Sequence, residues 1–314
     1  MNNIDKEFLN KFARVCEMAA YGASKFRGKN DKIAADQAAV DEMRAELNKI
    51  KMRGRIVIGE GEMDEAPMLF IGEKVGTKKG QKIDLAVDPL EGTNFVAKNL
   101  PNAFSVLAAA EQNNLFFAPD TYMEKIAIGA NLPKNLVDLD YSVEKNISLL
   151  AEAKNMSPDK LTACVLDRPR HKKIIESLKK MNVKLKLISD GDVSGVIYIV
   201  DKKSPVDIYL GIGGGPEGVL AAAALSCYGG QIQTRLVLDN KQKKRIDQFG
   251  IKNLKKKYNI EDMVKGDVIF CATAITDGLL VPGIQKKDDE FVTSTYALHK
   301  SSNTIKKVTN IHKG

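Results

Sequence analysis

The chain has 314 residues, of which 44% are hydrophobic and 28% charged, and this composition describes a globular protein large enough for two closely packed subdomains. No apolar run approaches the roughly 20 residues that cross a bilayer, and the N-terminal residues lack the regions of a signal peptide. We therefore expect a cytoplasmic protein with no membrane partner.

The net charge is +8, but the lysines are dispersed and the few aromatic residues, 6% of the chain, do not alternate with them as a stacking surface for bases requires. No nucleic-acid partner is expected.

Cysteine and histidine indicate no chemistry of their own. The cysteines lie far apart without a CxxC pair, so we expect buried free thiols rather than a zinc site or disulfides. These cysteines are Cys16, Cys164, Cys227 and Cys271. The histidines are His171, His299 and His312. No nucleophilic triad is expected from them, and His171 is expected to be structural.

Apolar patterns predict the elements of the first half of the chain. Helices are expected over residues 3–24, 34–50, 66–73 and 142–154. Strands are expected over residues 55–58, 83–87, 103–112 and 125–129.

Strands and helices alternate from about residue 160. Strands are expected over residues 161–166, 184–188 and 206–212, and helices over 171–181, 192–200 and 216–228. This alternation is typical of a layered α/β protein. We expect an N-terminal subdomain of residues 1–160 and a C-terminal subdomain of residues 161–314.

The most informative segment is Asp88-Pro-Leu-Glu-Gly-Thr93, which follows the apolar residues 83–87. We expect it to form a turn where a buried strand ends, with Pro89 fixing φ and Gly92 permitting a tight reversal. Two carboxylates held at a strand end suit Mg²⁺ or Mn²⁺, which prefer oxygen ligands. A solvated acidic turn is the alternative if the segment is considered alone.

Other acidic residues stand at expected element ends. Glu60 and Glu62 lie on a glycine-broken turn after a strand, and Asp36 lies on an expected helix. Glu217 follows Gly-Ile-Gly-Gly-Gly-Pro216 at an expected helix start, where amide donors suit phosphate or an acidic side chain. Several carboxylates together indicate a two-metal site for phosphate chemistry. The glycines also resemble a dinucleotide fingerprint, but proline replaces its third glycine, so nucleotide binding is not favoured.

These motifs resemble the lithium-sensitive, metal-dependent phosphatase superfamily and, within it, class II fructose-1,6-bisphosphatases. The resemblance rests on residues 57–68, 88–93, 118–125, 168–171, 189–192 and 211–218 and extends to residues 305–312. It implies the layered α/β/α/β/α sandwich of the sugar phosphatases. Two departures are Arg168, where lysine is frequent in the family, and Asn94, where a basic residue is common.

The resemblance implies roles for the acidic residues. Asp36 and Glu60 would hold one ion, whereas Asp88, Glu91 and Glu217 would hold another. The ions would be Mn²⁺ or Mg²⁺, two or more per site. Thr93 would orient or help deprotonate the attacking water beside Asp36, and Lys32 and Asp64 would support catalysis.

The resemblance also implies how a sugar bisphosphate is bound. Two arginines that flank a proline suit a distal phosphate, since guanidinium pairs with phosphate oxygens through two hydrogen bonds. Asp190 and Asp192 would accept hydrogen bonds from sugar hydroxyls. The expected substrate-binding residues are Glu91, Gly92, Thr93, Tyr122, Arg168, Pro169, Arg170, Asp190, Gly191, Asp192 and Gly214.

The implied reaction is hydrolysis of the 1-phosphate of fructose 1,6-bisphosphate to fructose 6-phosphate, a step of gluconeogenesis, by a homo-oligomer (a dimer or tetramer). One alternative is a dual enzyme that also cleaves sedoheptulose 1,7-bisphosphate. An inositol-monophosphate phosphatase is less favoured because Arg170 would then have no second phosphate to bind. A non-catalytic sugar-phosphate or metal-binding protein is a further alternative.

Overall fold

The computed structural model describes residues 3–59, 69–117, 121–238 and 251–313. The chain divides into two compact units, which we call unit 1 (residues 1–117 and 264–314) and unit 2 (residues 118–263). These units differ from the expected subdomains because the last strands of the chain return to the first sheet. Strand β11 (Val268–Ala274) pairs along its length with β4 (Phe104–Glu111). No described helix is long and apolar enough to span a membrane.

Unit 1 is built on an eight-stranded sheet with the order β12-β13-β11-β4-β3-β1-β2, in which β14 pairs with β13. Strands β1 and β3 run parallel, whereas the other neighbours run antiparallel. The remaining strands of this sheet are β1 (Met52–Ile58), β2 (Lys74–Val75), β3 (Gln81–Glu91), β12 (Gln285–Lys287), β13 (Glu290–His299) and β14 (Thr304–Lys313).

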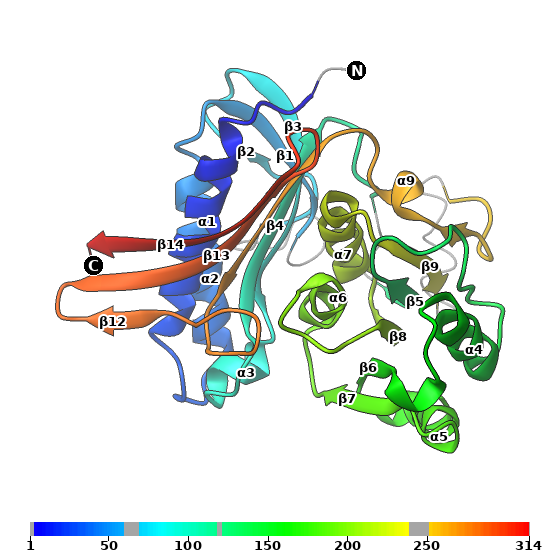
Figure 1. Cartoon of the computed structure of the whole chain (residues 1–314). Helices are drawn as coiled ribbons and strands as arrows, with labels where there is room; N and C mark the ends of the chain where they lie inside the picture. Colours follow the sequence, from blue (N-terminus) through cyan, green and yellow to red (C-terminus); the bar gives the residue numbers. More distant parts are fainter. Residues whose placement is uncertain (1–2, 60–68, 118–120, 239–250, 314) are drawn as a thin grey trace. The chain divides into compact units, whose positions relative to one another are not determined.

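Helices α1 (Phe8–Ser24) and α2 (Lys32–Leu47) cover one face of this sheet (Figure 1). Their buried side chains, such as Phe12 and Met43, share one core with strand residues such as Leu107. The short helix α3 (Thr93–Ala97) follows β3 directly. Because α2 packs beside α3, the fold brings two of the predicted acidic segments to the same part of unit 1.

Unit 2 contains a six-stranded sheet with the order β10-β9-β5-β8-β6-β7. Its strands are β5 (Tyr122–Ile128), β6 (Thr162–Leu166), β7 (Lys184–Ile188), β8 (Ile208–Gly214), β9 (Gln231–Val237) and β10 (Lys257–Tyr258). Strand β6 runs parallel to β7 and β8, whereas β5 runs antiparallel to β8 and β9. The short helices η1 (Pro158–Lys160), η2 (Pro169–His171) and α9 (Ile260–Met263) complete the connections.

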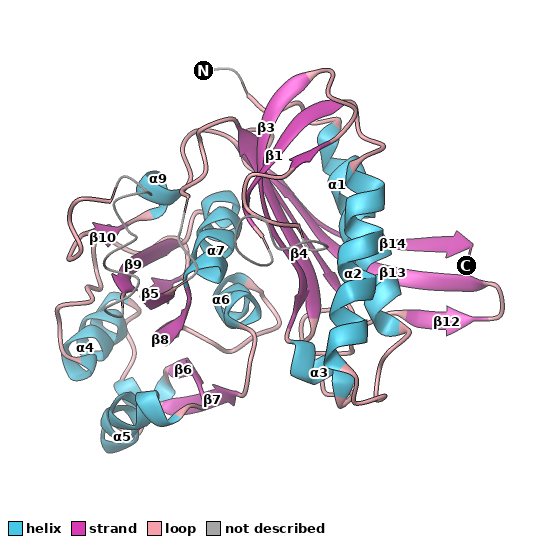
Figure 2. Ribbon diagram, turned by 180° about the vertical axis from the view of Figure 1, so that it is seen from behind, coloured by secondary structure: helices cyan, strands magenta, loops and turns pink. Residues whose placement is uncertain are grey.

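Four longer helices of unit 2 lie on the two faces of its sheet, α4 (Val143–Ala153) and α5 (Lys172–Lys180) on one face and α6 (Asp192–Val200) and α7 (Gly215–Tyr228) on the other (Figure 2). The buried alanines of α7 have small side chains, which let α6 pack closely against it. Gly229, at φ +75°, ends α7 in the left-handed conformation that favours glycine.

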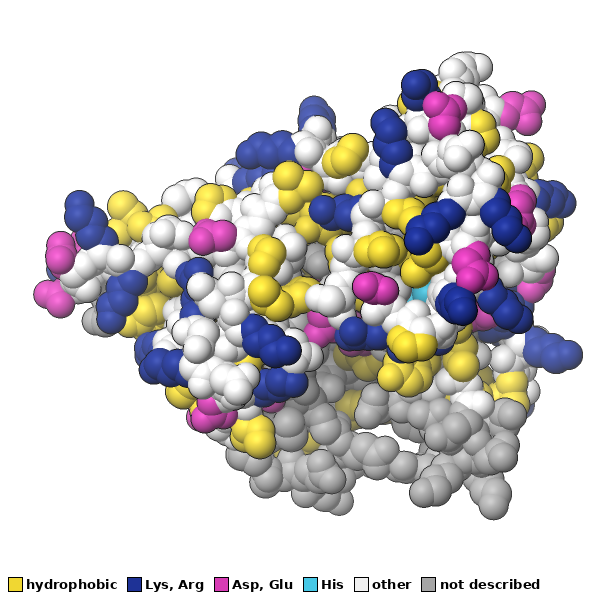
Figure 3. Space-filling view, turned by 90° about the horizontal axis from the view of Figure 1, so that it is seen from below, with side chains coloured by type: hydrophobic (Ala, Val, Ile, Leu, Met, Phe, Trp, Pro, Cys, Tyr) yellow, Lys and Arg dark blue, Asp and Glu magenta, His cyan; other side chains and the backbone are white. Residues whose placement is uncertain are grey.

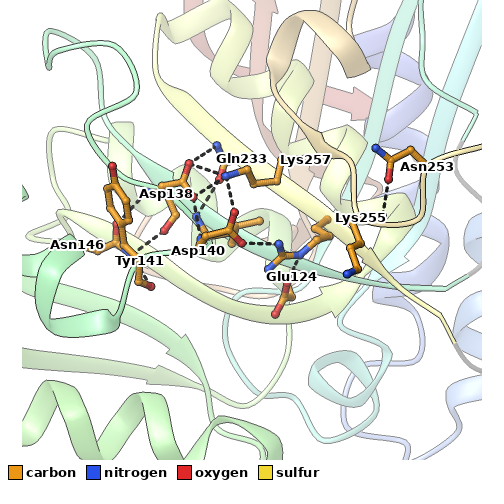
Figure 4. Close-up of polar contacts among 11 residues, drawn as sticks. Glu124, Asp138, Asp140, Tyr141, Asn146, Gln233, Asn253, Lys255 and Lys257 are labelled. Atoms are coloured by element: carbon orange, nitrogen blue, oxygen red, sulfur yellow. Dashed lines mark hydrogen bonds and ion pairs between the residues drawn. The ribbon is translucent and has the colours of Figure 1, made fainter.

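A network of charged residues ties the segment before α4 to the sheet edge of unit 2 (Figure 4). Lys257 Nζ donates to Asp138 Oδ1 over 2.7 Å and to Asp140 Oδ2 over 2.8 Å. Arg235 joins Asp140 to Glu124, at 2.6 and 2.8 Å. The hydrogen bonds from Lys257 and then Arg235 lower the pKa of Asp140 to about 2. The network therefore stays ionised at neutral pH and fixes this segment.

The structure confirms the predicted α/β class, and a helix or strand overlaps nearly every expected element. The helix expected over residues 66–73 is the exception, since residues 69–73 form a turn and irregular chain and residues 66–68 lie outside the described residues. The strands after residue 230 were not predicted from the sequence, because they depend on pairing with strands that are distant in the chain and show little local hydrophobic pattern.

Candidate active site

The segment Asp88–Thr93 lies within and just beyond β3, which differs from the expected turn. Strand β3 continues to Glu91, and its pairing with β4 shifts register between Asp88 and Glu91. A β-bulge of this kind re-aims side chains and tolerates a proline, which explains Pro89 inside a strand. Asp88 Oδ1 also accepts a hydrogen bond from Leu90 N over 3.1 Å. The bulge and this hydrogen bond hold the two carboxylate positions at the end of β3.

The reversal after β3 requires glycine. Gly92 has φ +83°, and a β-carbon at this position would lie 2.6 Å from the Phe95 ring. Thr93 therefore becomes the first residue of α3, next to the buried Glu91. The expectation that Gly92 permits a tight reversal is confirmed.

Asp36 lies on α2. Asp31 caps the start of this helix, since Asp31 Oδ1 accepts a hydrogen bond from Ala34 N over 3.0 Å. Burial raises the pKa of Asp36 above its usual range. Asp36 is thus a partly buried carboxyl, of the kind that a bound cation would stabilise in its charged form. Lys32 is the exposed first residue of the same helix.

Carboxylate oxygens in unit 1 are therefore suitable ligands for a hard divalent ion. Within the described ranges, no three His, Cys, Asp or Glu side chains lie close enough to form a metal site by themselves. The predicted ligand Glu60 lies outside the described residues, as do Glu62 and Asp64, of which Asp64 was expected to support catalysis. The ligand set from the sequence analysis stays a prediction.

The start of β5 and the end of β8 bring three predicted substrate-binding residues together in unit 2. Tyr122 pairs with Gly214 across the two strands and is 52% exposed. Arg170 Cζ lies 5.0 Å from the centroid of the Tyr122 ring, and its Nε and Nη2 both donate to Ile212 O, at 2.9 and 2.8 Å. The guanidinium is thus positioned by the backbone and an aromatic face.

His171 explains why the arginine segment keeps this position. Its Nδ1 lies 2.7 Å from Leu166 O, and its Nε2 accepts from Ile212 N over 2.7 Å. The ring is therefore neutral, with the proton on Nδ1, and burial lowers its pKa below the usual range. This geometry agrees with a structural His171. Nearby, Arg168 Nη2 lies 3.7 Å from Asp190 Oδ1.

Asp192 begins α6 after Gly191, whose φ of +85° lets the chain turn sharply into the helix. The Asp192 side chain is buried and forms an ion pair with Lys125 Nζ. A β-carbon on Gly213 would lie 1.6 Å from Asp192 Oδ2. Gly213 is therefore glycine because the carboxylate fills the space of a side chain.

Glu217 occupies the first turn of α7, as predicted. Its carboxylate folds back over Gly214, where a β-carbon would lie 1.9 Å from Glu217 Oε2. The glycine run of β8 thus accommodates one carboxylate at Gly213 and another at Gly214.

Lys125 is the residue that the sequence analysis missed. It lies in the middle of β5, paired with Gly211 and Thr234, and is almost fully buried. A lysine directly before the apolar residues 126–128 of a strand was the available signal, because a buried cation needs a buried acidic partner.

The basic residues give no sign of a polynucleotide surface on the face that Figure 3 shows. Lysines and arginines are interspersed there with acidic and apolar side chains. A polynucleotide surface would instead gather basic residues along one continuous patch.

An α/β protein with carboxylates at one strand end and positioned arginines at another has the groups of an enzyme that acts on a phosphorylated substrate. A family model described as bacterial fructose-1,6-bisphosphatase, glpX-encoded, matches residues 6–312. The chain therefore belongs to this family of class 2 fructose-1,6-bisphosphatases, which are phosphoric monoester hydrolases. The resemblance seen in the sequence is confirmed, and membership implies a phosphatase that depends on divalent metal.

Two curated relatives match nearly end to end. The fructose-1,6-bisphosphatase class 2 of Haemophilus influenzae is 42% identical over 317 residues, which cover 96% of this chain and 95% of that protein. The D-fructose 1,6-bisphosphatase class 2/sedoheptulose 1,7-bisphosphatase of Synechocystis sp. is 41% identical over 324 residues, which cover 95% and 94%. A solved structure of the extragenic suppressor protein suhB from Bartonella henselae is more distant, with 11% identity, a TM-score of 0.37 and coverage of 63% and 73%.

Proposed function

We propose that this chain hydrolyses the 1-phosphate of fructose 1,6-bisphosphate to give fructose 6-phosphate and inorganic phosphate, a step of gluconeogenesis. The observation that carries the proposal is the family match over residues 6–312. It is supported by the described site residues, since Asp36, Asp88, Glu91, Thr93 and Glu217 are all present with side chains suited to this chemistry.

In this proposal the divalent ions are Mg²⁺ or Mn²⁺, held by Asp36, Glu60, Asp88, Glu91 and Glu217. When bound, such ions supply positive charge for the phosphate oxygens and favour hydroxide at neutral pH. The position of Asp36 supports this assignment, because its carboxyl is partly buried on α2, which packs beside α3, and burial raises its pKa.

Thr93 orients the attacking water with its hydroxyl, close in sequence to the buried Glu91. Lys32 and Asp64 assist as a positive charge and as a proton-transfer group. Glu91, Gly92 and Thr93 also contact the substrate around the reacting phosphate. These roles are proposals based on the residue types and on the geometry at the end of β3.

The residues of unit 2 bind the sugar and its second phosphate. Arg170, held by Ile212 O and stacked on Tyr122, is ready to pair with phosphate oxygens, and Arg168 and Pro169 shape the same segment. Asp190, Gly191 and Asp192 accept and orient sugar hydroxyls, while the backbone at Gly214 offers a close approach because it carries no side chain.

A second candidate function is dual activity on fructose 1,6-bisphosphate and sedoheptulose 1,7-bisphosphate. The observation that favours it is the Synechocystis relative, whose name includes both substrates at 41% identity. The two sugars differ by one carbon, which a partly exposed site accommodates at low cost.

The test is phosphate release from fructose 1,6-bisphosphate, sedoheptulose 1,7-bisphosphate and inositol monophosphate, each with Mg²⁺ and with Mn²⁺. We expect rapid release from the first sugar, and release from the second identifies the dual enzyme. Preference for inositol monophosphate would contradict the assignment of Arg170 to a second phosphate. No release with either metal would favour a non-catalytic sugar-phosphate or metal-binding protein. A cytoplasmic location and a homo-oligomer, dimer or tetramer, stay predictions.

A further inference from the structure

A row of polar side chains, none of which is named in the proposed function, occupies the hairpin turn between β13 and β14 in unit 1. His299 ends β13, and Ser301 and Ser302 form the turn. Ser302 Oγ lies 2.9 Å from His299 Nδ1, and His299 Nε2 lies 3.0 Å from Asp267 Oδ2. No triad was expected from the sequence because Asp267 lies 32 residues before His299.

The position of each proton follows from the partners. Asp267 accepts hydrogen bonds from Val268 N at 2.9 Å, Ser301 N at 2.9 Å and Ser301 Oγ at 2.8 Å, so its oxygens act as acceptors. A carboxylate 3.0 Å from His299 Nε2 requires a proton on that nitrogen. In the neutral ring, Nδ1 then has a lone pair and accepts from Ser302.

Thr304 completes the row. Its Oγ1 lies 2.7 Å from Ser302 Oγ. Since the Ser302 proton points to His299, the Thr304 hydroxyl donates to Ser302. The resulting order, Ser302 to His299 to Asp267, is the order of hydrogen bonds that activates a serine nucleophile, with Nδ1 and Nε2 exchanged relative to the arrangement of serine proteases.

We propose that Ser302 is an activated nucleophile that accepts acyl groups from activated acyl donors such as aryl esters and thioesters. Ser302 Oγ forms a bond to the carbonyl carbon while its proton moves to His299 Nδ1, and Asp267 stabilises the charged ring. The bond from that carbon to the leaving oxygen or sulfur then breaks, its electron pair departs with the leaving group, and His299 returns the proton to it. The products are an ester on Ser302 and a free phenol or thiol.

Exposure supports this role. His299 and Asp267 are buried, so their mutual orientation is fixed, whereas Ser302 is partly exposed on a turn that a small donor can reach. Ser301 provides a natural comparison because it lies on the same turn and is more exposed. Its hydroxyl donates to Asp267 Oδ2 and lies 3.2 Å from the protonated Nε2 of His299, so it does not reach the Nδ1 lone pair that would take its proton.

The experiment uses the full chain and p-nitrophenyl acetate as the probe. We expect release of about one p-nitrophenolate per chain and an acetyl group on Ser302 by peptide mass spectrometry. Ser302→Ala removes the labelling, whereas Ser301→Ala, the matched control, retains it. His299→Gln slows labelling by about 100-fold or more, the range of a lost general base.

Phosphate release from fructose 1,6-bisphosphate serves as the independent control for folding, and each of these variants should retain it. Acetylation confined to other residues, or equal labelling of Ser302 in His299→Gln, would show that the row only stabilises the turn. If His299→Gln does not fold, the comparison of Ser302→Ala with Ser301→Ala still decides the question. The result does not depend on the phosphatase assignment.

Discussion

Two strand ends, one in each unit, use the same residue types in different ways. At the end of β3 in unit 1, the bulge and Gly92 hold Asp88 and Glu91, and the partial burial of Asp36 on the neighbouring helix raises the pKa of its carboxyl. At the end of β8 in unit 2, the buried Asp192 is paired with Lys125, and Arg170 is positioned nearby. The first region gathers carboxylates, whereas the second also contains the basic side chains of Lys125 and Arg170. This difference agrees with the proposal that the end of β3 contributes metal ligands and that Arg170 binds a phosphate.

The largest expected effect tests the proposed metal ligands at the end of β3 in unit 1. Asp88→Ala should lower kcat by about 1,000-fold or more, because loss of a metal ligand removes several kcal/mol of transition-state stabilisation. The measurement is phosphate release at saturating metal. Asp41→Asn, a control on the same helix as Asp36, should leave kcat nearly unchanged. Near-normal activity of Asp88→Ala would show that the metal assignment is wrong.

A double-mutant cycle tests the claim that unit 2 neutralises its own charges. Lys125→Met should lower the free energy of unfolding by about 3–5 kcal/mol, since Asp192 is left buried without its partner. The double variant with Asp192→Asn should recover much of that loss, as measured by urea denaturation. The exposed pair of Lys11 and Glu7 is the control, and Lys11→Met should cost less than about 1 kcal/mol.

The same cycle separates stability from substrate binding. If Asp192 contacts the sugar, the double variant folds but keeps a raised KM for fructose 1,6-bisphosphate. Recovery of both stability and KM would assign the pair to structure alone.

Arg170→Ala should produce a smaller change that is confined to binding. Loss of a charge-assisted hydrogen bond of about 1.5–3 kcal/mol raises the KM for fructose 1,6-bisphosphate by roughly 10- to 100-fold, with a smaller effect on kcat. Steady-state phosphate release provides the measurement. The neighbouring exposed Lys172→Ala should leave KM within about twofold. An unchanged KM in Arg170→Ala would contradict the proposal that Arg170 binds a phosphate of the substrate.

The smallest expected effect is a change with pH in the free energy of unfolding that is caused by His171. The pKa of His171 is lowered in the folded chain, mainly by burial, from the ordinary value of 6.5, so the unfolded chain binds more protons below that value. The free energy of unfolding should therefore fall as the pH drops below about 6.5 toward the folded pKa. Urea denaturation at pH 7.5 and 5.5 measures the change. His171→Gln should show a shallower dependence, and an identical one would remove His171 as its cause.

Most of the candidate site residues could be proposed from the sequence because they lie in short, continuous motifs. Asp88 and Glu91 follow an apolar run, and Glu217 follows a glycine-rich strand end at the start of a helix, so local patterns were enough to single them out. The strand through Asp88 was predicted too short, because a bulge depends on pairing with β4 rather than on local composition. Lys125 was missed for the same reason, since its partner lies 67 residues away.

The sequence by itself determined the family, the acidic motifs and most of the helices and strands, because these depend on residue type and on local periodicity. Only the tertiary structure decided the division into units, since it depends on β11 returning to β4. It also decided why Gly213 and Gly214 carry no side chain, because that space is filled by the carboxylates of Asp192 and Glu217. The row of Ser302, His299 and Asp267 also depends on the tertiary structure. The hairpin turn brings Ser302 to Nδ1 of His299, and the pairing of β11 with β13 brings Asp267 to its Nε2.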